Sequence, residues 1–102
     1  MTTFFITRHA GAIEWAKAQG LAIDCWMTHL DDVEKIQPGD TVIGILPLHT
    51  AAAICARGAR FIALELVLSE KNRGKELSAR EMASCQCQLT EYTICKLDSV
   101  KK

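Results

Sequence analysis

Residues 41–46 read TVIGIL, a nearly continuous apolar run that stops at Pro47. Strands that are buried on both faces have this composition. Such strands are typical of parallel sheets, because helices cover both faces of the sheet. The run therefore predicts a buried strand at residues 41–46 and, with it, a layered α/β domain.

The segments on either side of this run alternate between strand-like and helix-like patterns. The other predicted strands are residues 3–7, 22–27, 61–68 and 92–97. The predicted helices are residues 12–19, 50–57 and 78–89, the last beginning with a capping box at Ser78 and Glu81. This order indicates one three-layer α/β domain over residues 1–97, with a mostly parallel sheet of about five strands. Residues 98–102 are expected to form a frayed tail.

The charge balance excludes one class of partner. The 102 residues include 12 Lys plus Arg and 12 Asp plus Glu, so the formal net charge is zero. Proteins that hold long nucleic acids through their phosphates usually carry a clear basic excess, which is missing here. A small anionic ligand stays possible, because a few local positive groups suffice to bind it.

The cysteines and the hydropathy pattern bear on the compartment. The five cysteines are odd in number, and their spacing matches no disulfide framework. Reduced thiols in a cytoplasmic protein are therefore expected. No segment resembles a signal peptide or the run of about 20 apolar residues that spans a bilayer, so no membrane partner is expected.

Arg8 and His9 directly follow the first predicted strand, where an apolar run stops abruptly. In open parallel sheets, ligands bind beyond the carboxyl ends of the strands, where the strand order reverses. Gly11 allows a sharp turn there, and the following helix offers free N–H groups and the positive end of its dipole. The pattern predicts a small anion site with Arg8 and His9 as candidate catalytic residues.

Neighbouring strand ends should contribute ligand-binding residues. The strand at 41–46 leads into the second helix, and the strand at 61–68 leads into the basic loop SEKNRGKEL at residues 69–77, which has a glycine hinge. The candidate ligand-binding residues are Thr7, Gly11, Trp15, Pro47, His49, Thr50, Lys71 and Arg73. Their spacing matches no metal site, so no metal or cofactor is expected.

Several of these residues also have a purely structural interpretation. The alternatives are a surface ion pair with Glu14 for Arg8, helix capping for His9 and His49, core packing for Trp15, a turn position for His29 and a solvated loop for residues 69–77. Convergence of basic groups from separate strand ends on one crevice favours a functional site.

One resemblance to a known family concerns a short motif. Residues 6–9, Ile-Thr-Arg-His, resemble the Arg-His-Gly motif that ends the first strand of histidine phosphatases and phosphoglycerate mutases. Ala10 occupies the position of the glycine in that motif. Those domains are also much longer and need a second catalytic histidine far downstream.

A second resemblance extends over nearly the whole chain. The stretches TRHAGAIEWAKAQG (residues 7–20), QPGDTVIGILPLHTAAAICARGARF (37–61) and RGKELSAREM (73–82) resemble a small CRISPR-associated family of the Csx group. Its members are ancillary proteins of type III systems, and they are similar in fold to the Rossmann-like sensor domains of type III signalling. The resemblance implies a ring nuclease, which binds cyclic oligoadenylate, most often the tetra-adenylate ring, and cuts it to switch off the antiviral signal.

The implied reaction needs no metal. A ribose 2′-hydroxyl attacks the adjacent phosphate and leaves a 2′,3′-cyclic phosphate. From the residues themselves, Arg8 is expected to stabilise the phosphate charge, and a histidine, with His9 as the candidate, is expected to protonate the leaving oxygen. The two-fold axis contained in a four-fold ring suits a homodimer. Two alternatives are a non-catalytic sensor or sponge that leaves the ring intact, and a histidine-phosphatase-like enzyme that forms a phosphohistidine at His9.

Overall fold

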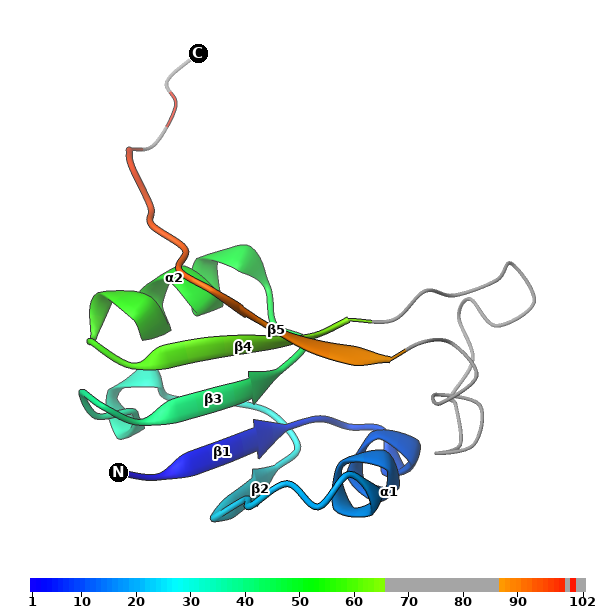
Figure 1. Ribbon diagram of the computed structural model, residues 1–102. Helices are drawn as coiled ribbons and strands as arrows, with labels where there is room; N and C mark the ends of the chain where they lie inside the picture. Colours follow the sequence, from blue (N-terminus) through cyan, green and yellow to red (C-terminus); the bar gives the residue numbers. More distant parts are fainter. Residues whose placement is uncertain (66–86, 99, 101–102) are drawn as a thin grey trace.

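The computed structural model describes residues 1–65, 87–98 and 100. These residues form a five-stranded sheet in the order β2-β1-β3-β4-β5 (Figure 1). The strands are β1 (Thr3–Ile6), β2 (Cys25–Met27), β3 (Thr41–Gly44), β4 (Arg60–Glu65) and β5 (Gln88–Tyr92). The helices are α1 (Ala10–Ala18), the 3₁₀ helix η1 (Val33–Lys35) and α2 (Leu48–Ala56). Strands β1 to β4 are parallel and β5 is antiparallel to β4, which confirms the mixed α/β class and the mostly parallel sheet.

The central strand β3 derives from the TVIGIL run. It pairs with β1 on one side and with β4 on the other, so none of its length lies at an edge. Val42 is fully buried and Ile43 is 5% exposed. Because successive side chains point to opposite faces of a sheet, these two residues require cover on both sides.

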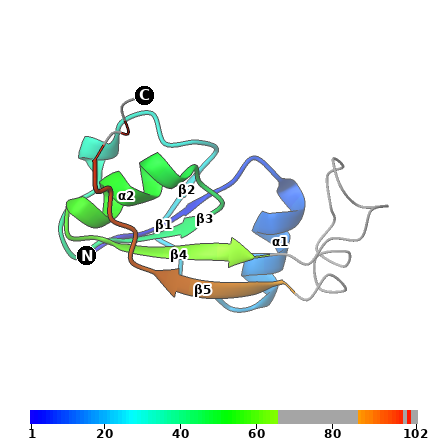
Figure 2. The same ribbon diagram turned by 90° about the horizontal axis from the view of Figure 1, so that it is seen from above.

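The two α-helices supply this cover on opposite faces of the sheet. On one face, Trp15 of α1 belongs to the same buried cluster as Phe5 and Ile43. On the other face, Ile54 of α2 belongs to a cluster with Val42. The helices lie well apart in both views of the molecule (Figures 1 and 2). The result is the predicted arrangement of three layers.

The strand order reverses between β1 and β3. From β1 the chain passes through α1 to β2 on one side of β1, and then crosses to β3 on the other side. From β3 it continues through α2 to β4, away from β1. The chain therefore leaves the carboxyl ends of β1 and β3 toward opposite faces. Open α/β sheets bind ligands at such a point.

The C-terminal part of the prediction was wrong in its boundaries. The sequence pattern predicts that residues 88 and 89 end a helix at 78–89, but they begin strand β5. The predicted strand at 92–97 is replaced by Gln88–Tyr92. Pairing with β4 decides this, because Leu89 opposes Leu64 across the ladder. The rest of the predicted helix, the loop at 69–77 and the end of the strand at 61–68 lie outside the described residues.

Two boundaries near the N-terminus also differ. Helix α1 begins at Ala10 rather than at residue 12, and β2 begins at Cys25 rather than at residue 22. The Asp24 carboxylate accepts a hydrogen bond from the backbone N–H of Thr3 at 2.8 Å. A side chain thus takes the place of a ladder partner, which shortens the strand at this end.

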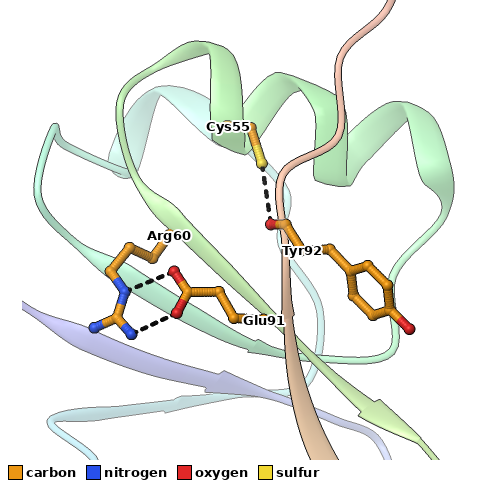
Figure 3. A network of polar contacts seen from close by, with 4 residues as sticks. All are labelled: Cys55, Arg60, Glu91 and Tyr92. Carbon is orange, nitrogen blue, oxygen red and sulfur yellow. Dashed lines mark hydrogen bonds and ion pairs between the residues drawn. The ribbon is translucent and has the colours of Figure 1, made fainter.

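The edge strand β5 and the segment after it are held by polar contacts (Figure 3). The Arg60 guanidinium donates two hydrogen bonds to the Glu91 carboxylate, at 2.9 and 2.7 Å. This pairing lowers the pKa of the Glu91 carboxyl and raises the pKa of Arg60. The Cys55 thiol of α2 lies 3.9 Å from the Tyr92 carbonyl oxygen and accepts from the Ile94 N–H at 3.5 Å. These contacts fix the C-terminal segment against α2.

Asp40, directly before β3, ties together the amino ends of three strands. It is 5% exposed, and its two carboxylate oxygens accept hydrogen bonds from the backbone N–H groups of Thr2 and Gln37, both at 2.9 Å. Its carbonyl oxygen accepts from the Arg60 N–H at 2.8 Å. The hydrogen bonds from Gln37 and then Thr2 lower the pKa of the Asp40 carboxyl. One residue, through its carboxylate and its backbone carbonyl, thus connects the starts of β1, β3 and β4.

We expect the substitution Asp40→Asn to destabilise the protein in a pH-dependent way. The amide can accept through one atom only, so one backbone N–H loses its acceptor. Because the pKa of Asp40 is lower in the folded state, the carboxylate stabilises the fold above its unfolded pKa, and this contribution is lost as the pH falls through the folded pKa. The variant should melt several degrees below wild type at neutral pH, and the difference should shrink below about pH 4.

Thermal unfolding followed by circular dichroism, at neutral pH and at about pH 3, measures this difference. Asp98→Asn, in the exposed C-terminal segment, is the matched control and should melt like wild type at both values. An equal loss for Asp40→Asn at both pH values would contradict the assigned role of the carboxylate.

Candidate functional site

A cleft lies over the carboxyl ends of β1, β2 and β3. Its volume is about 500 Å³, and its lining comes from residues 6–9, 28–30 and 45–47 together with Thr50. These segments directly follow the three strands, and the middle strand of the three is β1, beside which the order reverses. The cleft is thus at the place that the sequence predicted for a ligand.

Thr7 holds two of the lining segments side by side. Its backbone N–H donates to the carbonyl oxygen of Met27 at 2.9 Å, which extends the pairing of β1 and β2 to the edge of the cleft. Its hydroxyl oxygen accepts from the backbone N–H of His9 at 3.1 Å. The segment with His9 and the segment that follows Met27 are therefore fixed next to each other.

Arg8 and His9 both line the cleft, and both are exposed. Among the described residues, Arg8 forms no ion pair, so the expected alternative of a pair with Glu14 is not seen. His9 occupies the N-cap position of α1, but its side chain makes no capping hydrogen bond. Both side chains are available to a ligand in this arrangement.

Two helix N-termini meet the cleft. Helix α1 starts directly after His9, and α2 starts directly after Pro47. Neither helix has an acidic residue in its first turn or a side-chain cap. No carboxylate is found among the described residues that line the cleft. The positive ends of the two helix dipoles are therefore not neutralised locally, and together with Arg8 they favour an anion.

His29 lies in the same cleft, on the segment after β2. Its ring nitrogen Nε2 is 2.5 Å from Oδ1 of Asp31, and its Nδ1 is 3.3 Å from Oγ1 of Thr28. The cleft thus contains a histidine with one nitrogen on a carboxylate and the other on a hydroxyl. This triplet can orient an imidazole for proton transfer.

The structure brings together only part of the predicted site. Thr7, Pro47 and Thr50 line the cleft with Arg8 and His9. Gly11 is buried inside α1. Lys71 and Arg73 lie outside the described residues.

Two further candidates lie away from the cleft. Trp15 is 6% exposed and packs in the core, which is the alternative to ligand binding that the sequence offered for this residue. His49 lines a different groove, between α2 and residues 93–96. His49 is the second residue of α2 and lies on a different side of the helix from Thr50, which lines the cleft.

Sequence reasoning missed Thr28 and His29. The predicted strand at 22–27 places both residues directly beyond a carboxyl strand end, and the same rule singled out Arg8. The position directly after a predicted strand could therefore have identified His29 as a site residue, but the neighbouring Leu-Asp-Asp favours a turn position for it. The turn contact exists, in the form of the Asp31 pair, and the side chain still lines the cleft.

A second polar cluster lies at the carboxyl end of β4. The hydroxyl groups of Thr90 and Tyr92 donate to the Glu65 carboxylate, with Tyr92 at 2.5 Å. These bonds lower the pKa of the Glu65 carboxyl, and they raise the pKa of the Tyr92 hydroxyl. The cluster fastens β5 to β4 and does not line the cleft. Within the described residues, no group of His, Cys, Asp and Glu side chains could hold a metal ion.

Residues 4–95 match the model of a family described as "Putative CRISPR-associated protein (Cas_VVA1548)". The matched range includes every segment that lines the cleft. No curated protein and no solved structure matches the chain. In the parts of the chain that the structure describes, no helix is long and apolar enough to cross a membrane.

We expect Gly44 to be required for the close approach of β1 and β3 beneath the cleft. A Cβ atom built at Gly44 would overlap the carbonyl oxygen of Ile6, which itself lines the cleft. Gly44→Ala should therefore push the two strand ends apart and lower the free energy of unfolding by about 1–3 kcal/mol, as overpacking does in other cores. Urea unfolding measures this loss, and a midpoint equal to that of wild type would contradict it.

Proposed function

Because the chain belongs to this CRISPR-associated family, we propose that it is a ring nuclease of type III systems that binds cyclic oligoadenylate and cleaves it. The observation that carries the proposal is the cleft at the strand-order reversal, where Arg8, His9 and two uncapped helix N-termini meet. None of the described lining residues carries a carboxylate, and the nearby Asp31 carboxylate is paired with His29 at 2.5 Å.

The charge distribution supports a compact polyanion as the ligand. The formal net charge of the chain is zero, so long nucleic acid is a poor partner. A cyclic oligoadenylate concentrates its phosphates in a small ring, and one local positive site suffices to bind it. The tetra-adenylate ring is the favoured ligand, because its two-fold axis lets a homodimer apply two copies of the same cleft.

The proposed reaction uses the ring's own ribose 2′-hydroxyl as nucleophile. The hydroxyl oxygen attacks the adjacent phosphorus in line with the leaving 5′-oxygen, and the products are a 2′,3′-cyclic phosphate end and a 5′-hydroxyl end. Arg8 donates paired hydrogen bonds to the phosphate oxygens as their charge grows. His9 protonates the leaving oxygen. Binding in the cleft supplies the alignment of the reacting atoms.

The decisive experiment incubates the pure protein with cyclic tetra-adenylate in the presence of EDTA. Ring cleavage to linear fragments with 2′,3′-cyclic phosphate ends, identified by mass, is the expected result. Recovery of the intact ring from a stable complex would instead identify a sensor or sponge. An intact ring with no binding at all would rule out both functions.

We expect Arg8→Ala to weaken ring binding without harming the fold. A hydrogen bond to a charged group contributes enough that its loss lowers affinity about ten- to a hundredfold. Arg8 is exposed and forms no ion pair among the described residues, so the free energy of unfolding should change by less than about 0.5 kcal/mol. Arg8→Lys should restore part of the affinity, because lysine keeps the charge but lacks the planar fork.

Isothermal titration with the ring and thermal melting measure these two effects separately. Arg60→Ala is the matched control. Arg60 is the first residue of β4, so it lies at the end of the strands away from the cleft, and it pairs with Glu91. It removes the same charge and should leave ring affinity unchanged. Full affinity in Arg8→Ala, with a normal melting temperature, would place the phosphate site elsewhere.

A further inference from the structure

We propose that His29 is the general base of the reaction, held in position by Asp31. The inference rests on the proposed function and completes it, since cleavage through the 2′-hydroxyl needs a group that removes the hydroxyl proton. The observation that carries it is the contact of both ring nitrogens of a histidine that lines the cleft.

The two contacts of the imidazole are chemically different. The Asp31 carboxylate only accepts hydrogen bonds, so the Nε2 atom at 2.5 Å from it carries a proton. In a neutral ring, the Nδ1 atom is then an acceptor, and it faces the Thr28 hydroxyl at 3.3 Å. In the neutral ring, the acceptor nitrogen thus already faces a hydroxyl group at the cleft.

A ribose hydroxyl can take the place of the Thr28 hydroxyl. The Thr28 contact is exposed and joins adjacent residues, so it constrains the ring only weakly. The side chains of His29 and Asp31 are 56% and 68% exposed, which leaves them accessible to a ligand that enters the cleft. Asp31 stabilises the imidazolium that forms when Nδ1 takes the proton.

Apart from His9, to which the proposed reaction assigns the role of the acid, no other described group of the cleft can serve as this base. The lining contains no carboxylate, and the guanidinium of Arg8 does not lose its proton in proteins. His9 acts as the acid. His49 lies in the separate groove beside α2. His29 is therefore the remaining titratable side chain among the described lining residues.

The positions of His9 and His29 suit opposite roles. They follow the adjacent strands β1 and β2, which the Thr7 to Met27 hydrogen bond joins at the cleft. In-line displacement requires a base at the attacking oxygen and an acid at the leaving oxygen, on opposite sides of the phosphorus. Two histidines on separate segments can flank one phosphate in this way, with Arg8 beside it.

The proton balance of the step closes without a further reactant. Nδ1 of His29 takes the proton of the 2′-hydroxyl, and the 2′-oxygen forms its bond to phosphorus. The bond from phosphorus to the 5′-oxygen breaks, and protonated His9 gives its proton to that oxygen. His29 ends protonated and His9 neutral, and exchange with water restores both.

The first test compares His29→Gln with His49→Gln in single-turnover cleavage of cyclic tetra-adenylate. His29→Gln should bind the ring within about twofold of wild type and cleave it about 10²- to 10⁴-fold more slowly. His49→Gln removes a histidine outside the cleft and should cleave at the wild-type rate. Circular dichroism confirms that both variants are folded. Cleavage by His29→Gln at the wild-type rate would overturn the inference.

A second test separates the base from the acid. A ring with sulfur in place of the bridging 5′-oxygen has a leaving group that needs no protonation. On this substrate His9→Gln should regain most of its rate, whereas His29→Gln should stay slow. The reverse pattern would exchange the two roles and overturn the inference.

The positioning role of Asp31 has its own measurement. Asp31→Asn should keep the affinity for the ring and lose rate by more than about tenfold, with the loss persisting on the sulfur-bridged substrate. Glu14→Gln, at an exposed position of α1, is the charge-matched control and should cleave normally. If wild-type protein leaves the ring intact, the proposed function fails together with this inference. If wild type cleaves and Asp31→Asn and His29→Gln cleave equally well, only this inference fails.

Discussion

The contact between β1 and β3 is the constraint on which the rest of the structure depends. The two strands run parallel and adjacent, yet the helices that follow them pack on opposite faces of the sheet. The chain must therefore diverge at their carboxyl ends, and the space between the diverging segments is the cleft. Gly44 permits this geometry, because any side chain there would meet the backbone of Ile6. Strands β1 and β3 thus pack closely up to Gly44, and the segments that follow them separate to line the cleft.

The parts of the fold that the sequence predicted are those with strong burial. Val42 and Ile43 are apolar because strand β3 is covered on both faces, and the apolar run indicated a parallel sheet. The run was wrong in its end, because β3 stops at Gly44 and Ile45 is 61% exposed. The rule for carboxyl strand ends then placed Arg8 and His9 at the cleft, together with Thr7, Pro47 and Thr50. In each of these cases, position along the chain determines position in space, since the residue lies in the segment between a strand and the first turn of the following helix.

Prediction was weaker wherever a distant part of the chain decides the outcome. Strand β5 exists through its pairing with β4, and residues 88–92 carry only a mild strand pattern of their own. Trp15 and His49 are close in sequence to cleft residues, but helix geometry turns one into the core and the other toward a separate groove. His29 and Asp31 are close in sequence. Their place in the cleft, however, depends on the neighbouring segment that carries His9.

Two polar contacts that hold the fold together lie at the amino ends of the strands, opposite the cleft, whereas the Glu65 cluster lies at the carboxyl end of β4. Asp40 and the Arg60 ion pair lie where β3 and β4 begin, and the cleft lies where the strands end. A strand of four residues, such as β1, spans about 13 Å. Substitutions more than about 7–10 Å apart usually have independent effects on stability. The exposed side chains of the cleft, such as Arg8 and His9, can therefore change while the scaffold keeps its stability, so the same scaffold can support clefts of different chemistry.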